Sequence, residues 1–151
     1  MKKELLFCVR LKGGAVYMKN DVVYNKAQIM ERCLKRIHEE YNNNDENLKN
    51  YTKQDSIILN IQRACEAAID LAMHIVAEEK LGIPQNSRDA FELLCAIGMI
   101  DQNLSKKLQA MVGFRNIAVH DYQAVNLDIV KIIIEKHIDD LQEFIRIVLK
   151  E

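Results

Sequence analysis

The sequence predicts an all-α fold, an antiparallel four-helix up-and-down bundle with one additional short helix. Its 151 residues include one proline and five glycines, and 49% are hydrophobic, which is typical of a compact helical domain. Apolar residues recur at steps of three and four through five successive segments, and no stretch alternates like an amphipathic strand. Because helices joined by short connections pack antiparallel, these segments are expected to form a bundle.

The first two segments have the clearest boundaries. The first spans residues 21–41 and is followed by an asparagine-rich turn at residues 42–47. The second spans about residues 53–81, where Thr52 and Asp55 resemble a capping box and Gly82 and Pro84 follow the last apolar positions. Its apolar positions extend over a wide face, so we expect it to be the central helix of the bundle.

Three further segments complete the bundle. The third begins after Ser87, a favourable N-cap, and ends near Gly98. The fourth starts after Asp101 and carries the most informative motif of the chain. The fifth starts near Asn126 and continues almost to the C-terminus.

The composition excludes several classes of protein. No apolar run is long enough to cross a bilayer, so no membrane association is expected. The cysteines are widely spaced and form no CxxC pair, so neither a disulfide nor a metal site is expected. Three of them lie within apolar helical patterns, so we expect small core side chains in a reducing, cytoplasmic protein. The four cysteines are Cys8, Cys33, Cys65 and Cys95.

The first seventeen residues differ from the rest, and we divide the chain into residues 1–17 and a helical domain at 18–151. Lys12-Gly13-Gly14 can be encoded by a bacterial ribosome-binding sequence, and Met18 follows after three codons. We hypothesise that translation starts at Met18 and that residues 1–17 are a non-native or disordered leader. The alternative is a genuine N-terminal arm.

This division changes the charge of the domain. The chain has a formal net charge of −1, but residues 1–17 hold four cations against one glutamate, which leaves −4 on the rest. A protein that binds nucleic acid through its overall field is basic. Any contact with nucleic acid is therefore expected to be local.

The stretch from Arg115 to Tyr122 places a guanidinium, an imidazole and a phenol within two helical turns. Arg115 continues the apolar line of the fourth segment, which is formed by Leu104, Leu108 and Met111. A charge at such a position is costly unless it is paired or functional. Because this segment is apolar nearly all round, we expect a homodimer with the fourth helix near the interface.

Arg115 and His120 are separated by about 140° on an ideal helix, so they do not share a face. Two arrangements would bring them to one substrate. The helix could end before His120, so that the imidazole turns back toward Arg115. Alternatively, a dimer axis could bring Arg115 of one chain close to His120 of the other.

An arginine with a histidine suits phosphodiester cleavage. A guanidinium binds phosphate through two hydrogen bonds, and an imidazole exchanges a proton near neutral pH. With RNA, the 2′-hydroxyl can serve as the nucleophile, so neither a protein nucleophile nor a metal is required. The spacing by itself fits equally a polar network at a helix end.

The motif resembles that of a known family. Arg115-Asn116, three further residues and His120 are similar to the signature of the HEPN superfamily, and Tyr122 narrows the resemblance to the HepT-like toxins. The similarity extends from about Met18 to the C-terminus and includes the second segment and residues 111–116. Residues 1–17 fall outside it.

The resemblance implies a dimeric helical bundle and a metal-independent endoribonuclease, the toxin of a type VII toxin–antitoxin system. By carry-over, Arg115 and His120 are catalytic and Asn116 is an auxiliary polar residue. The implied partner is a nucleotidyltransferase antitoxin that uses ATP to attach AMP to Tyr122; the toxin itself needs no cofactor. We keep two alternatives: a non-catalytic dimeric module that binds a nucleotidyltransferase or a nucleotide, and a structural dimer bridged by Arg115.

Other polar residues have simpler interpretations. Glu66, Asp70 and His74 fall at steps of four and are expected to form a salt-bridged stripe, with a role in the cleft or in metal binding as the alternative. His137 is expected to be a packed histidine with one hydrogen bond. Four cations could add positive potential near the cleft, namely Arg88, Lys106, Lys107 and Lys131.

Overall fold

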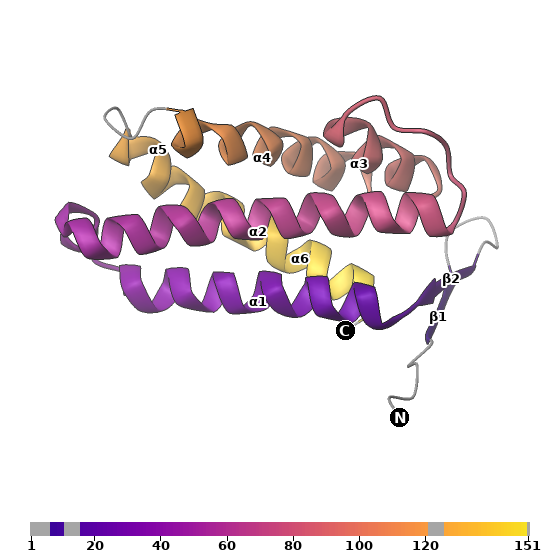
Figure 1. Cartoon of the computed structure of the whole chain (residues 1–151), viewed down its shortest axis with the longest axis horizontal. Coiled ribbons are helices and arrows are strands. Elements are labelled where there is room, and N and C mark those ends of the chain that lie inside the picture. The colour runs from indigo at the N-terminus through magenta and orange to yellow at the C-terminus, as the bar shows by residue number, and fades with distance from the viewer. Residues whose placement is uncertain (1–6, 11–15, 121–125, 151) are drawn as a thin grey trace.

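The computed structural model describes residues 7–10, 16–120 and 126–150, with side chains over 20–115 and 126–150. In Figure 1, the long helix α2 (Tyr51–Glu78) lies in the middle of the bundle. The helix α1 (Asp21–Tyr41) runs along one side of it and α4 (Gln102–His120) along the other. The C-terminal helix crosses behind α2 and packs on α1, α2 and α4. The predicted all-α bundle is confirmed.

Two shorter elements connect these helices. A 3₁₀ turn, η1 (Asp45–Lys49), joins α1 to α2, after α1 ends on Asn42 with a φ of 48°. The short helix α3 (Ser87–Ala96) packs on α2 and α4 and is the additional helix that the sequence predicts.

A β-hairpin precedes the bundle, which the sequence analysis did not predict. The strands β1 (Phe7–Arg10) and β2 (Val16–Lys19) pair antiparallel, with Phe7 opposite Lys19 and Arg10 opposite Val16. Part of the expected leader therefore has regular structure here. Translation from Met18 stays a prediction.

Several helices begin with an asparagine cap, and two of these caps differ from the prediction. Asn50 accepts a hydrogen bond from the amide of Lys53 at 3.1 Å, so α2 begins at Tyr51 and the capping box predicted at Thr52 is wrong. Asn86 caps α3, which makes Ser87 the first helical residue instead of the cap. In each case the asparagine stands just before the predicted cap, and its carboxamide oxygen satisfies free amides of the first turn.

The predicted fifth helix is one continuous run with an irregular centre. It consists of α5 (Leu127–Ile132), the π-helical segment η2 (Ile133–His137) and α6 (Ile138–Leu149). Asn126 caps its start and accepts a hydrogen bond from the amide of Asp128 at 2.9 Å. A π segment widens one helical turn and changes the direction of the side chains that follow.

The core lies between α2 and the helices around it. Phe91 of α3 and Phe144 of α6 meet edge to face, with their ring centroids 5.8 Å apart, and both are buried. Cys33 and Cys65 are buried free thiols, as predicted, whereas Cys95 is only partly buried. Among the described helices, none has the length and apolarity to span a membrane.

Candidate active site

The motif lies near the end of α4, and the earlier turns of this helix are packed in the core. The carboxylate of Asp101 accepts a hydrogen bond from the amide of Leu104 at 2.7 Å, which fixes the start of the helix as predicted. Leu104, Leu108 and Met111 are at most 3% exposed and form the buried line that the sequence predicts. Arg115 is the next residue on this line and the first that is not apolar.

Arg115 leaves the core and reaches the edge of α2. Its side chain is 29% exposed, and its Nη1 atom lies 3.4 Å from Oε2 of Glu66, whose side chain is 53% exposed. An ion pair at this exposure contributes at most about 1 kcal/mol to stability. A phosphate can therefore displace the carboxylate from the guanidinium at little cost.

For the other motif residues, the structure describes the backbone of Asn116 and His120 but not Tyr122. Asn116 and His120 lie in the last turns of α4, and Tyr122 lies outside the described residues. The helix continues through His120, so the arrangement in which it ends before this residue is wrong. On an ideal helix, positions 115 and 120 are separated by about 140° of rotation.

The acidic stripe on α2 is confirmed as a row of ion pairs. Glu66 binds Arg115, and Asp70 binds Lys26 of α1 at 3.1 Å. His74 lies 3.8 Å from Glu78 and within 3.3 Å of the carboxamide of Asn20, the residue that caps α1. Glu66 thus reaches the motif, whereas Asp70 and His74 connect α2 to α1.

No metal-binding group is apparent in the described part of the chain, where no three His, Cys, Asp or Glu side chains come together. The metal-independent mechanism stays a prediction.

A buried thiol lies beneath the Arg115–Glu66 pair. Cys65 is 2% exposed, and burial raises its pKa to about 12, while the nearby charge of Arg115 opposes this shift. A thiol with so high a pKa is a poor nucleophile at neutral pH. Cys65 is therefore part of the core under the motif and has no place in the chemistry.

The π-helical segment η2 contacts α4 at Phe114, the residue before Arg115. The imidazole of His137 lies against the ring of Phe114, with the centroids 5.6 Å apart. Its Nδ1 atom lies 3.1 Å from the buried carboxylate of Asp140, which also binds Lys107 at 3.7 Å. The prediction that His137 is a packed histidine with one hydrogen bond is confirmed.

The four cations that were expected near the cleft are in different situations. Lys107 is bound to Asp140, and Lys131 is bound to Asp45 at 2.6 Å. Arg88 lies beside the motif helix, because a Cβ atom built on Gly113 would be 3.6 Å from its guanidinium. Lys106 is exposed. Of these cations, Arg88 of α3 is the one whose side chain lies against α4 close to the motif, at Gly113.

Sequence reasoning did not identify Glu66 specifically as the partner of Arg115. The spacing of Glu66, Asp70 and His74 marks a polar stripe, but the helical register between α2 and α4 decides which member meets the motif. That register depends on core packing and has no local signal in the sequence.

Comparison with known proteins gives consistent matches. The family model described as ribonuclease HepT-like matches residues 30–148, which include α2, α4 and the motif. The mRNA nuclease HepT of Shewanella oneidensis is 49% identical over 132 residues, which cover 87% of this chain and 99% of that protein.

Solved structures extend the similarity to the fold. The tri-AMPylated HEPN toxin of Shewanella oneidensis in complex with MNT antitoxin has a TM-score of 0.80 and 49% identity, covering 88% of this chain and 100% of that chain. A toxin–antitoxin structure with AMP-PNP has a TM-score of 0.79 and 48% identity, covering 87% of this chain and 100% of that chain. Nearly the whole length of each relative is therefore matched.

Proposed function

This chain belongs to the HepT-like ribonuclease family, and we propose that it is the toxin of a type VII toxin–antitoxin system. Its activity is the metal-independent endonucleolytic cleavage of RNA. Arg115 and His120 are the catalytic residues, and Asn116 is an auxiliary polar residue. The protein acts in the cytoplasm.

The course of α4 is the observation that carries this proposal. Because positions 115 and 120 differ by about 140° on a continuous helix, we do not expect one chain to direct both groups to the same phosphate along one helical face. A second copy of the chain supplies the missing group if the two motif helices meet at a twofold axis. The functional unit is therefore a homodimer with composite sites.

The chemistry follows from the two side chains and the RNA. The 2′-hydroxyl attacks the adjacent phosphorus, the O2′–P bond forms and the P–O5′ bond breaks, which leaves a cyclic phosphate and a 5′-hydroxyl. The guanidinium of Arg115 exchanges the carboxylate of Glu66 for the phosphate oxygens and stabilises their developing charge. The imidazole of His120 transfers the proton.

Neutralisation requires a nucleotidyltransferase partner. The phenol of Tyr122 attacks the α-phosphate of ATP, AMP is transferred and pyrophosphate leaves. The added phosphate then occupies the cationic cleft and excludes RNA. The similarity to an AMPylated toxin in complex with an MNT antitoxin supports this assignment. ATP is used by the partner, and the toxin itself needs no cofactor.

The test uses the protein purified without its partner. The wild type is expected to cleave single-stranded RNA in EDTA, whereas Arg115→Ala and His120→Ala remain folded dimers by light scattering and cleave no RNA. Full activity of either variant contradicts the mechanism. No cleavage by the wild type indicates a non-catalytic module, and dissociation of Arg115→Ala indicates a structural bridge.

The modification is tested separately by intact mass. With the partner and ATP, the wild type gains AMP and Tyr122→Phe does not. Tyr51→Phe is the matched control, because Tyr51 is a second tyrosine, 80% exposed at the start of α2 and outside the motif. Equal modification of the wild type and Tyr122→Phe would overturn the assignment.

A further inference from the structure

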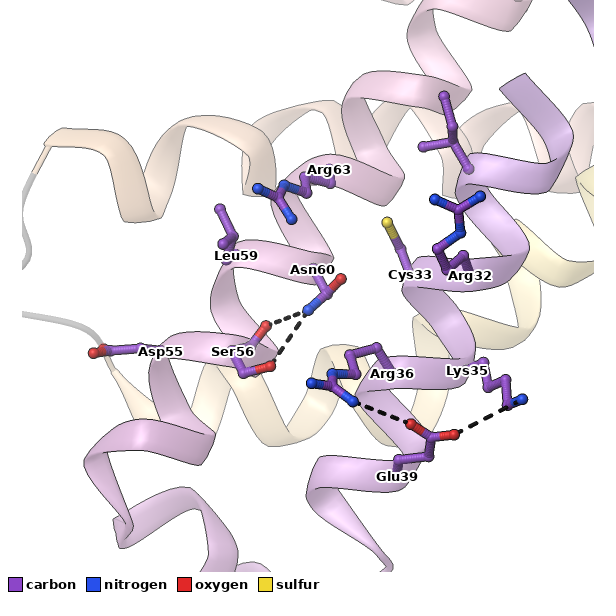
Figure 2. A pocket seen from close by; sticks show the side chains of 11 residues that line it. Arg32, Cys33, Lys35, Arg36, Glu39, Asp55, Ser56, Leu59, Asn60 and Arg63 are labelled. Atoms are coloured by element: carbon purple, nitrogen blue, oxygen red, sulfur yellow. Dashed lines mark hydrogen bonds and ion pairs between the residues drawn. The ribbon is translucent and has the colours of Figure 1, made fainter. Parts of the chain in front are cut away.

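An open groove of about 770 Å³ lies between α1 and α2, outside the motif. Arg32, Lys35 and Arg36 line it from α1, and Arg63 lines it from α2. Figure 2 shows Arg32 and Arg63 on either side of Cys33, whereas Glu39 and Asp55 lie toward the other end. One end of the groove is therefore strongly cationic, although the chain as a whole has a net charge of −1.

The cations of the groove differ in their partners. Lys35 and Arg36 are bound to Glu39 at 3.9 and 3.6 Å. Among the described side chains, Arg32 and Arg63 have no carboxylate within ion-pair distance, and both are exposed. Both guanidiniums nevertheless act on the same buried thiol, since their charges lower the pKa of Cys33 against the larger effect of burial. Like charges at one end of a groove repel each other, and an anion bound there lessens that repulsion.

The cationic end of the groove is close to the proposed active site along α2. Arg63 precedes Glu66 by one helical turn, a rise of about 4.5 Å, and Glu66 is the residue that contacts Arg115. A strand whose phosphate binds Arg115 can therefore continue along this face of α2 and enter the groove.

We propose that the α1–α2 groove binds the sugar-phosphate backbone of the RNA substrate, next to the phosphate that is cleaved. Arg32 and Arg63 bind its phosphates, and this proposal rests on the proposed ribonuclease function. None of the described residues that line the groove is aromatic, so bases have no ring to stack on and the contribution of the groove is independent of sequence. A local cationic groove also explains how a domain with a net negative charge could bind RNA.

Binding is measured without cleavage, by fluorescence anisotropy of a labelled single-stranded RNA in the His120→Ala background. Adding Arg32→Gln and Arg63→Gln is expected to raise the Kd on the order of tenfold at low salt. The slope of log Kd against log salt is expected to fall by about 1.4, because each lost phosphate contact on a single strand removes about 0.7.

The matched control removes two exposed cations elsewhere, with Lys136→Gln and Arg146→Gln in the same background. This control lowers the net charge equally and is expected to leave the salt slope unchanged. An equal loss in both double variants would overturn the proposal, because it would indicate a general effect of charge.

Two other outcomes separate this proposal from the function on which it rests. If the His120→Ala protein binds RNA and the groove variant binds it equally well, the groove proposal is wrong and the ribonuclease function is unaffected. If the His120→Ala protein binds no RNA, both fail. If the groove variant instead loses its dimer or its antitoxin by light scattering and binds RNA normally, the groove is a protein interface and the proposal is overturned.

Discussion

The arginine of the motif and the arginines of the groove differ in their exposure and in their ion pairing. Arg115 is partly buried and held by the carboxylate of Glu66, whereas Arg32 and Arg63 are exposed and have no such partner among the described side chains. A group that stabilises a reacting phosphate must be oriented before the substrate arrives, and the partial burial of Arg115 on the packed helix α4 favours this. A group that only holds the backbone contributes through its charge. Under the proposed function, the two regions separate chemistry from binding.

The largest expected effect comes from changing the shape of the motif cation without changing its charge. Arg115→Lys is expected to lower kcat/KM for RNA by about 10²-fold, because an ammonium cannot form two parallel hydrogen bonds to a phosphate. Arg63→Lys is the matched control, for which we expect a change of less than about threefold, since a backbone contact needs mainly charge. Equal losses in the two variants would remove the distinction between the two regions.

A smaller effect is expected when the motif arginine loses its partner. Glu66→Gln frees Arg115 for phosphate, so we expect RNA to bind a few-fold more tightly, with a change in the free energy of unfolding below about 1 kcal/mol. Glu78→Gln makes the same change of charge near the end of α2 and is expected to leave binding unchanged. A loss of cleavage in Glu66→Gln would instead assign Glu66 to the positioning of Arg115.

The motif helix can also be strengthened without touching its chemistry. Gly113→Ala is expected to raise the free energy of unfolding by about 0.5–1 kcal/mol, because the added Cβ makes only an ordinary contact with Arg88 and the unfolded chain loses freedom. Gly98→Ala is the opposite control, since Gly98 has a φ of 77° and alanine is strained there. Urea unfolding measures both variants. Destabilisation by Gly113→Ala would contradict the packing described for α4.

The smallest effect, on thermal stability, is expected at the exposed ion pair between Lys131 and Asp45, outside the motif and the groove. Lys131 and Tyr41 donate hydrogen bonds to Asp45 and hold its pKa below the ordinary value. A lowered pKa in the folded state stabilises the protein above about pH 4, and this stabilisation is lost as the pH falls through the folded value. Asp45→Asn should therefore lower Tm slightly at pH 7, with the difference from wild type disappearing in acid. A difference that persists in acid would exclude this origin.

Much of the fold could be predicted because the hydrophobic pattern determines it. The helix at residues 21–41 has the predicted boundaries, since its apolar line is regular and asparagines stand at both ends. The π segment at residues 133–137 could not be predicted, because its residues continue an ordinary helical pattern with no local signal for a widened turn. The hairpin at residues 7–19 pairs two strands of four residues, too short for a clear alternation.

For the candidate site, the sequence indicates residues but not their contacts. Arg115 is conspicuous because it interrupts an apolar line, and its ion pair shows how that charge is tolerated. The groove has no comparable signal. Arg32 and Arg63 each look like residues on the solvent-exposed face of a helix, and only the register of α1 against α2 brings them together.

The composite site is tested most directly with mixed dimers. One chain carries Arg115→Ala and the other His120→Ala, and heterodimers are isolated through two different affinity tags. If each site combines Arg115 of one protomer with His120 of its partner, one site lacks both groups and the other is intact. The heterodimer should then recover about half of the wild-type cleavage, although both parent homodimers are inactive. A heterodimer as inactive as its parents would show that both residues must come from one chain, which contradicts the account.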